Sequence, residues 1–169
     1  MEGINIVATA AFTEYLNSST STATPTTLNM GSTVASNLSI ATYPTSVGNY
    51  SMSKCFKLTF SGVTNTVYNI RMYKSDGSYV TGETISYGSS STYSVPTGGS
   101  YQDSNATTLL PTADPGASAP NITIGGTTSG TITATENTSD YIFLQSSITI
   151  QALAATTNEV TLTCTWSET

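Results

Sequence analysis

The sequence predicts an all-β protein: an antiparallel two-sheet β-sandwich, Ig-like or jelly-roll, folded as a single domain. Three observations support this fold class. Apolar and polar residues alternate over runs of strand length. Thr, Val, Ile and Tyr, which suit a half-buried pleated surface, are abundant. Turn residues interrupt the runs at intervals of about 8–12 residues, as in sandwiches and barrels. No amphipathic helix of three or more turns is indicated, and 169 residues suffice for one domain with a core.

The composition divides the chain into three parts. Residues 1–16 are expected to form a first strand, because alternate residues from Ile4 to Phe12 are apolar. Residues 17–31 are a polar Ser/Thr-rich linker or loop, and residues 32–169 form the body of the sandwich. A strand joined by a linker could be donated to a neighbouring molecule, although an ordinary first strand in its own sheet is the simpler alternative. The strand residues that would then form the interface are Ile4, Ile6, Ala8, Ala10 and Phe12.

The body contains further runs typical of strands. They span residues 34–40, 52–60, 67–73, 79–87, 93–95, 106–110, 121–124, 130–135, 142–150 and 160–166. Asp76-Gly77 is a strong hairpin signal, so the strands before and after it are expected to pair. A second long hairpin is expected from the last two strands, which turn around Asn158 and would be central to a sheet.

The two cysteines could form one disulfide, but the strand alternation opposes this. Cys55 alternates with Phe56 and Leu58 and so points away from their apolar face, whereas Cys164 shares the apolar face of Leu162. Sulfur atoms on opposite faces cannot meet without a bulge. Two free thiols, one of them in the core, are therefore the favoured interpretation.

The charge balance argues against two classes of partner. The formal net charge is −6, with only four Lys and Arg residues. Nucleic-acid binding needs a basic surface to neutralise phosphates, so nucleic acid and anionic membranes are disfavoured. No run is apolar enough to insert into a membrane. The N-terminal residues lack a secretory signal, so we expect either a signal already removed or synthesis without one.

The residues needed for catalysis are scarce. The chain has no histidine, the commonest proton shuttle and metal ligand near neutral pH, and no G-x-S-x-G motif. Lys54 and Lys57 are expected on an exposed strand face, which does not lower a lysine pKa. We therefore expect a non-enzyme without catalytic residues, cofactor or metal. A calcium loop at 103–105 or 136–140 is a weaker reading than ordinary solvated turns.

Tyrosines are concentrated in one third of the chain. Exposed aromatic rings can stack on sugars, whereas tyrosine also suits cross-strand packing and subunit interfaces, which we favour. The candidates for interface or glycan contact are Tyr73, Tyr79, Tyr87, Tyr93 and Tyr101. Six Asn-x-Ser/Thr sequons are candidates for N-glycosylation: Asn17, Asn37, Asn49, Asn105, Asn121 and Asn137.

A chain with many hydroxyl groups and few charges can bury broad neutral surfaces against copies of itself. Its strand edges also carry few of the lysines that prevent edge pairing in monomers. Three segments, residues 71–78, 141–145 and 165–168, resemble small β-sandwich proteins among the structural proteins of tailed viruses. The resemblance implies a structural protein of the virion, in capsid decoration, neck or tail, with partners that are further copies and other proteins of the particle.

Two alternatives remain open at this stage. The first is a subunit of an extracellular filament, sheath or surface layer, joined by donor-strand exchange; the sequons and the first strand favour it. The second is a carbohydrate-binding module, which the tyrosines favour.

Overall fold

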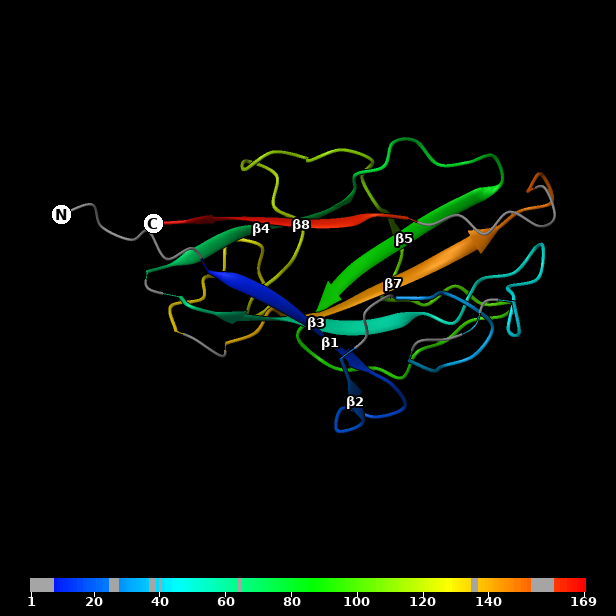
Figure 1. Ribbon diagram of the computed structural model, residues 1–169, viewed down its shortest axis with the longest axis horizontal. Helices are drawn as coiled ribbons and strands as arrows, with labels where there is room; N and C mark the ends of the chain where they lie inside the picture. Colours follow the sequence, from blue (N-terminus) through cyan, green and yellow to red (C-terminus); the bar gives the residue numbers. More distant parts are fainter. Residues whose placement is uncertain are drawn as a thin grey trace.

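The computed structural model describes residues 8–24, 28–36, 39, 41–63, 65–134, 137–152 and 160–169. Within them the fold is all-β with no helix, and its strands form two antiparallel sheets in one domain, which confirms the predicted fold class. The strands are β1 (Thr9–Tyr15), β2 (Thr22–Ala23), β3 (Lys54–Ser61), β4 (Val67–Lys74), β5 (Glu83–Ser90), β6 (Thr108–Leu109), β7 (Tyr141–Ile148) and β8 (Leu162–Glu168) (Figure 1).

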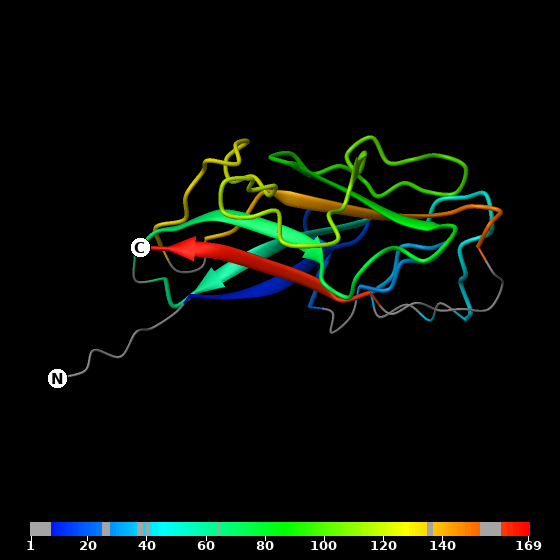
Figure 2. The same cartoon turned by 90° about the horizontal axis from the view of Figure 1, so that it is seen from above.

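The larger sheet has six strands in the order β2-β1-β3-β7-β5-β6, and the smaller sheet consists of β4 and β8. β1 pairs with β3 along its whole length, from Thr9 opposite Ser61 to Tyr15 opposite Cys55. β5 pairs with β7 over all eight residues. β4 and β8 run side by side over the larger sheet, and β1 begins at the end of the molecule where β8 finishes (Figures 1 and 2).

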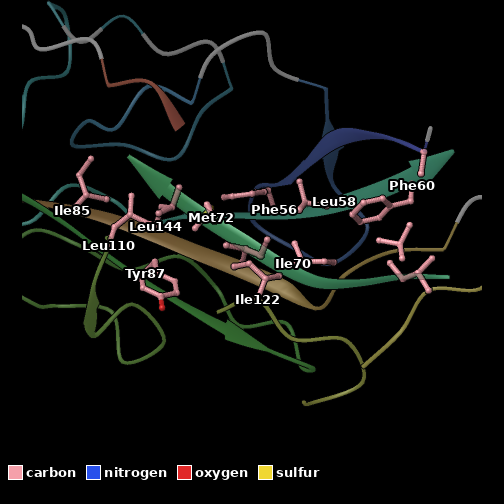
Figure 3. Packing of buried hydrophobic residues seen from close by; sticks show 14 residues of the cluster. Phe56, Leu58, Phe60, Ile70, Met72, Ile85, Tyr87, Leu110, Ile122 and Leu144 are labelled. Atoms are coloured by element: carbon pink, nitrogen blue, oxygen red, sulfur yellow. The ribbon is translucent and has the colours of Figure 1, made fainter. Parts of the chain in front are cut away.

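The main core lies between the two sheets. β3 contributes Phe56, Leu58 and Phe60, which are fully buried and alternate as the sequence predicts. Figure 3 shows these side chains facing residues of β4, among them Ile70 and Met72. β5, β7 and the connecting segments complete the cluster with Ile85, Tyr87, Leu110, Ile122, Ile132, Ile142 and Leu144.

The outer face of β3 is also buried, contrary to the expectation that Lys54, Lys57 and Cys55 face solvent. Of these residues only Lys57 and Cys55 lie on that face, whereas Lys54 shares the face of Phe56 and lies opposite Leu144 of β7. Cys55 is fully buried and packs with Phe143 and Ala106 in a second cluster on the outer face. Lys54 is 2 % exposed, whereas Lys57 is partly buried. The alternation correctly separates the two faces of the strand, but it does not show that the segment after β5 covers the outer one. Both thiols are free, with Cys164 packed against the main core.

A β-bulge changes the face of β4. The register with β8 shifts between Tyr68 and Arg71, and Asn69 has a left-handed φ of 52°. The extra residue lets Val67 and Ile70, three positions apart, both face the main core. The predicted face, which began at Tyr68, is therefore correct only from Ile70 onward.

Both predicted hairpins are wrong, although the chain bends at Asp76 and Ser78 and Gly77 has a left-handed φ of 95°. β4 pairs with β8, whereas β5 pairs with β6 and β7, so the connection after β4 crosses from one sheet to the other. The Lys74 ammonium stabilises this connection by donating to the carbonyl oxygens of Gly77 and Ser78 at 2.9 and 3.2 Å. The last two strands likewise lie in different sheets, and only β7 is central to one. Turn chemistry specifies a reversal of the chain and not the partner of the strand that follows.

Several shorter predictions also differ. Residues 93–95 are irregular, and in 121–124 and 130–135 only isolated bridges form, at Ile124 and Ile132. The strand expected at 106–110 is reduced to β6. Val34 lies in irregular structure, while Leu38 and Ile40 of the same expected strand lie outside the described residues.

The first strand is predicted from Ile4, and residues 4–7 lie outside the described residues. Its described part runs from Thr9 to Tyr15 and lies in the sheet of its own chain. Ala8, Ala10 and Phe12 pack against the main core, and the donation candidates Ile4 and Ile6 lie outside the described residues. Exchange of this strand with a neighbour stays a prediction. The segment expected as a linker contains β2, which pairs with β1 at Glu14 and Tyr15.

Candidate functional site

Each Lys, Arg, Asp and Glu side chain that the structure describes has a partner in its own chain. The most buried pair joins the two neighbouring strands β1 and β3. The Lys54 ammonium lies 3.0 Å from a carboxylate oxygen of Glu14, and the two side chains are 2 % and 1 % exposed. Lys54 also donates a hydrogen bond of 2.6 Å to the carbonyl oxygen of Ala35. The pair therefore ties β1, β3 and a loop together.

The other cations are engaged nearer the surface. The Arg71 guanidinium lies 2.9 Å from Asp114, and the Lys74 ammonium lies 2.8 Å from Asp76. The Lys57 ammonium lies 4.1 Å from the centroid of the Tyr141 ring, a cation–π contact. These contacts leave the surface of the described residues dominated by neutral side chains.

The Arg71–Asp114 and Lys74–Asp76 pairs, each a buried cation with a more exposed carboxylate, hold that carboxylate in the ionised form. The hydrogen bond from Lys74 is the largest cause that lowers the pKa of Asp76. For Asp114 the backbone N–H of Gly116 is the largest cause that lowers the pKa, and Arg71 adds to it. Both partners favour the charged carboxylate.

In the loops considered for calcium, Asp103 and Asp140 use their carboxylates to fix the chain, and Glu136 lies outside the described residues. Asp140 accepts hydrogen bonds from the Thr123 hydroxyl at 2.6 Å and from the backbone N–H groups of Gly125 and Gly126 at 3.1 and 2.7 Å. Asp103 accepts from the Ser53 hydroxyl and from Asn105. The oxygens of both carboxylates thus already have N–H or O–H donors. In the part of the chain that the structure describes, His, Cys, Asp and Glu residues form no group of three or more able to hold a metal.

Cys55 is buried and Cys164 is partly buried against the main core, and neither thiol is activated. Burial raises the pKa of Cys55 to about 12, and burial likewise raises the pKa of Cys164 to about 12. The thiolate is the nucleophilic form, so neither sulfur is activated near neutral pH.

The candidate tyrosines are distributed over different parts of the fold. Tyr87 is buried in the main core, and burial raises its pKa. Tyr79 donates to the carbonyl oxygens of Ile85 and Leu110 at 3.1 and 2.7 Å, and burial raises its pKa to about 12. Tyr73 is partly buried on β4, whereas Tyr101 is 76 % exposed.

The fifth candidate, Tyr93, belongs to an aromatic cluster on the outer face of the larger sheet. Its ring lies 6.4 Å from that of Tyr15 and 5.7 Å from that of Tyr141, and the last two lie 5.0 Å apart. Its hydroxyl donates to the carbonyl oxygen of Leu16. Tyr15 and Tyr141 are not among the predicted contact residues, and their only signal in the sequence is that both occupy strand ends. This cluster packs against Cys55 and Phe143 and so has a structural role.

The sequons differ in access. Asn17 and Asn137 are exposed, Asn49 is partly buried, and Asn37 lies outside the described residues. The side-chain amide of Asn121 bridges the backbone N–H and carbonyl of Met72 at 2.8 Å each, and that of Asn105 donates to Ser94 and Asp103. Because those amides are used by the fold, Asn17 and Asn137 are the more accessible candidates for glycosylation.

One side of the sandwich has an open strand edge. The outer edge of β4 is covered by other parts of the chain. The backbone N–H of Lys74 donates to the carbonyl oxygen of Pro111, and Val67 forms a β-bridge with Ile132. β8 pairs with β4 alone among the described strands. Thr161 and Thr169, which flank β8, form backbone hydrogen bonds with Ser75 and Thr66, which flank β4. The backbone groups of the odd-numbered residues between them therefore also point toward β4. The even-numbered ones, Leu162, Cys164, Trp166 and Glu168, point their backbone groups away from it.

In the larger sheet, β1 lies on the same side of the sandwich as β8. The backbone N–H of Ala8 donates to the Glu168 carboxylate at 3.0 Å, and the Phe60 ring, on the strand next to β1, packs edge-on against Trp166 at 5.2 Å. β2 covers β1 only at its last two residues. Phe12 and Trp166 are each partly buried against the core. The open side therefore presents strand edges with partly exposed apolar side chains between them.

Comparison with known proteins gives no relative. No family model, no curated protein and no solved structure matches this chain. Among the described residues there is no helix with the length and apolar character needed to cross a membrane.

Proposed function

We propose that this chain is a non-catalytic structural protein of a virus particle, a component of capsid decoration, neck or tail that assembles through neutral Ser/Thr/Tyr-rich β surfaces. The observation that carries the proposal is the internal pairing of the charges. With each described charged side chain already engaged in its own chain, the outer surfaces have little to desolvate when they meet another protein.

The composition of that surface fits contact with other proteins. Interface cores are depleted of charged residues and enriched in tyrosine. Exposed apolar side chains are present as well, including Leu109 on β6, which is 55 % exposed. The strand edges add backbone groups that can pair with another chain. These features favour association with copies of itself or with companion proteins over the binding of a charged ligand.

The assignment to a virion is supported by the resemblance of residues 71–78, 141–145 and 165–168 to tailed-virus structural proteins. In the structure these segments form the end of β4 with its connection, the start of β7 and the end of β8. The last strand of this set is the one with the open edge, so the resemblance includes the part of the fold best suited to assembly.

The experiment has two stages. Analytical ultracentrifugation over a wide concentration range measures self-association, which we expect to change little between low and high salt because the surfaces are neutral. Electron microscopy of the native material, labelled with an antibody against this chain, then locates it. Label on icosahedral or tailed particles supports the proposal. A chain that is monomeric at all concentrations and is absent from particles would refute it.

A second candidate function is a subunit of an extracellular filament, sheath or surface layer. The exposed sequons at Asn17 and Asn137 favour it, because N-glycans are added to surface positions of exported chains. The same microscopy separates the two, since label would then follow filaments and the purified native protein would carry added glycan mass.

A further inference from the structure

We propose that the open edge of β8 is a two-fold interface, at which two copies of this chain pair their β8 strands antiparallel and centred on Thr165. The proposal rests on the self-association put forward above and names the surface responsible. It starts from the fact that no described residue outside β4 forms a backbone hydrogen bond with Leu162, Cys164, Trp166 or Glu168.

The edge is self-complementary in its hydrogen bonds. In an antiparallel pair, residues that point toward each other exchange both N–H and carbonyl bonds. Centring the pair on Thr165 places Leu162 opposite Glu168 of the second copy, and Cys164 opposite Trp166. All four have their backbone groups directed outward, so the register uses every one of them. A register displaced by a single residue would bring outward-facing groups opposite inward-facing ones and lose these bonds.

The side chains also fit a second copy. Thr163, Thr165 and Ser167 lie on the outer face of β8, as shown by the Thr163 hydroxyl, which lies 2.7 Å from that of Ser75. In the proposed register Thr165 faces Thr165, and Thr163 faces Ser167. Cross-strand pairs of hydroxyl residues are favourable.

The charges near β8 also favour a second copy of this chain as the partner. The one charged residue of β8 is Glu168, and it would face the apolar Leu162 rather than another carboxylate. The lysines that usually prevent edge pairing are engaged elsewhere, Lys54 with Glu14, Lys57 with Tyr141 and Lys74 with Asp76. A strongly charged partner would find no unpaired counter-charge on this strand, whereas a second copy needs none.

The test is disulfide trapping with a matched control on the same strand and face. In Thr165→Cys the two new thiols of a two-fold dimer would meet in a non-hydrogen-bonded pair, with Cα atoms about 4.5 Å apart, within disulfide range. In Thr163→Cys the new thiol would face Ser167 and find no partner. Wild type supplies the background from Cys55 and Cys164, whose raised pKa values make them slow to react.

Under mild oxidation of the folded full chain we expect most of Thr165→Cys to run as a covalent dimer, with mass spectrometry giving a 165–165 linked peptide. Thr163→Cys should stay at the wild-type level. Equal cross-linking of both variants, or none in a protein that sediments as an oligomer, would overturn the β8 interface while leaving the proposed self-assembly standing. Assembly lost on deleting residues 1–7, without a 165–165 link, would assign the contact to strand donation instead. A wild-type chain that is monomeric throughout would overturn the β8 interface, and its absence from particles as well would overturn the proposed function.

Discussion

Replacing Lys54 with methionine should destabilise the protein by roughly 3–5 kcal/mol, the cost typical of breaking a buried ion pair by removing one partner. Lys54 and Glu14 are 2 % and 1 % exposed, so water cannot take over the role of the ammonium. Methionine has nearly the volume of the lysine stem, so little cavity forms. The loss is instead electrostatic: the Glu14 carboxylate loses its counter-charge, and the carbonyl oxygen of Ala35 loses its donor.

Urea unfolding followed by circular dichroism measures this free energy, and a double-mutant cycle isolates the pair. Lys54→Met combined with Glu14→Leu should recover most of the lost stability, because an apolar pair of similar volume needs no compensation. Lys57→Met is the matched control on the same strand, since Lys57 makes a cation–π contact and not a buried ion pair. It should cost only about 0.5–1 kcal/mol.

The reasoning would be refuted if Lys54→Met cost no more than Lys57→Met. That result would mean that water reaches Glu14 in the folded protein. The expected effect is large against the total stability of about 5–15 kcal/mol that is usual for a domain, so the assay has ample range.

Three further outcomes are expected. Gly82→Ala should destabilise the fold by at least about 2 kcal/mol in urea unfolding, because φ at Gly82 is +86° and a new Cβ would lie 2.2 Å from the backbone nitrogen of Ala152, after β7. Gly77→Ala is the control and should cost less, because Gly77 has a similar φ but open space around it. Equal losses of stability in the two variants would contradict the role of the close contact. The pKa of Asp114 is lower in the folded chain than in the unfolded one, so its stabilising effect is complete above the unfolded pKa of about 4 and is lost as pH falls through the folded value. Asp114→Asn should therefore flatten the fall in stability of the wild type in acid urea titrations, and identical slopes would count against it. Cys55 and Cys164 should react with a thiol reagent only on unfolding, and rapid labelling of the native protein at pH 8 would show that one of them is accessible.

The sequence predicts best where a strand follows one period from end to end. The alternation of Phe56, Leu58 and Phe60 locates β3 to within two residues and identifies its core face correctly. The opposite orientation of Cys55 and Cys164 is also correct, since each sulfur lies in a different apolar cluster. These properties are local, because successive side chains of a strand must point to opposite faces.

Strand partners are harder to predict, because pairing depends on residues far apart in the chain. Gly77 permits the turn that the sequence indicates, yet β5 pairs with β7 rather than with β4. The bulge at Asn69 is similarly invisible to a period-two pattern. β7 and β8 do not form the expected hairpin for the same reason. β7 pairs with β3 and β5 in the larger sheet, whereas β8 pairs with β4 in the smaller one.

The expectation that the outer face of β3 is exposed to solvent is wrong, and this difference has the largest consequence for function. A sandwich is expected to bury one face of each sheet, which places Lys57 and the tyrosines of the other face in solvent. Here a segment after β5 covers that face and brings Tyr93 against Tyr15 and Tyr141. Of the candidate rings, Tyr79, Tyr87 and Tyr93 therefore stabilise the fold, whereas Tyr101 stays exposed, and the lysines make contacts within the chain. What remains at the surface are hydroxyl groups and strand edges, and such a surface is suited to pairing with another β-sheet rather than to recognising a small ligand.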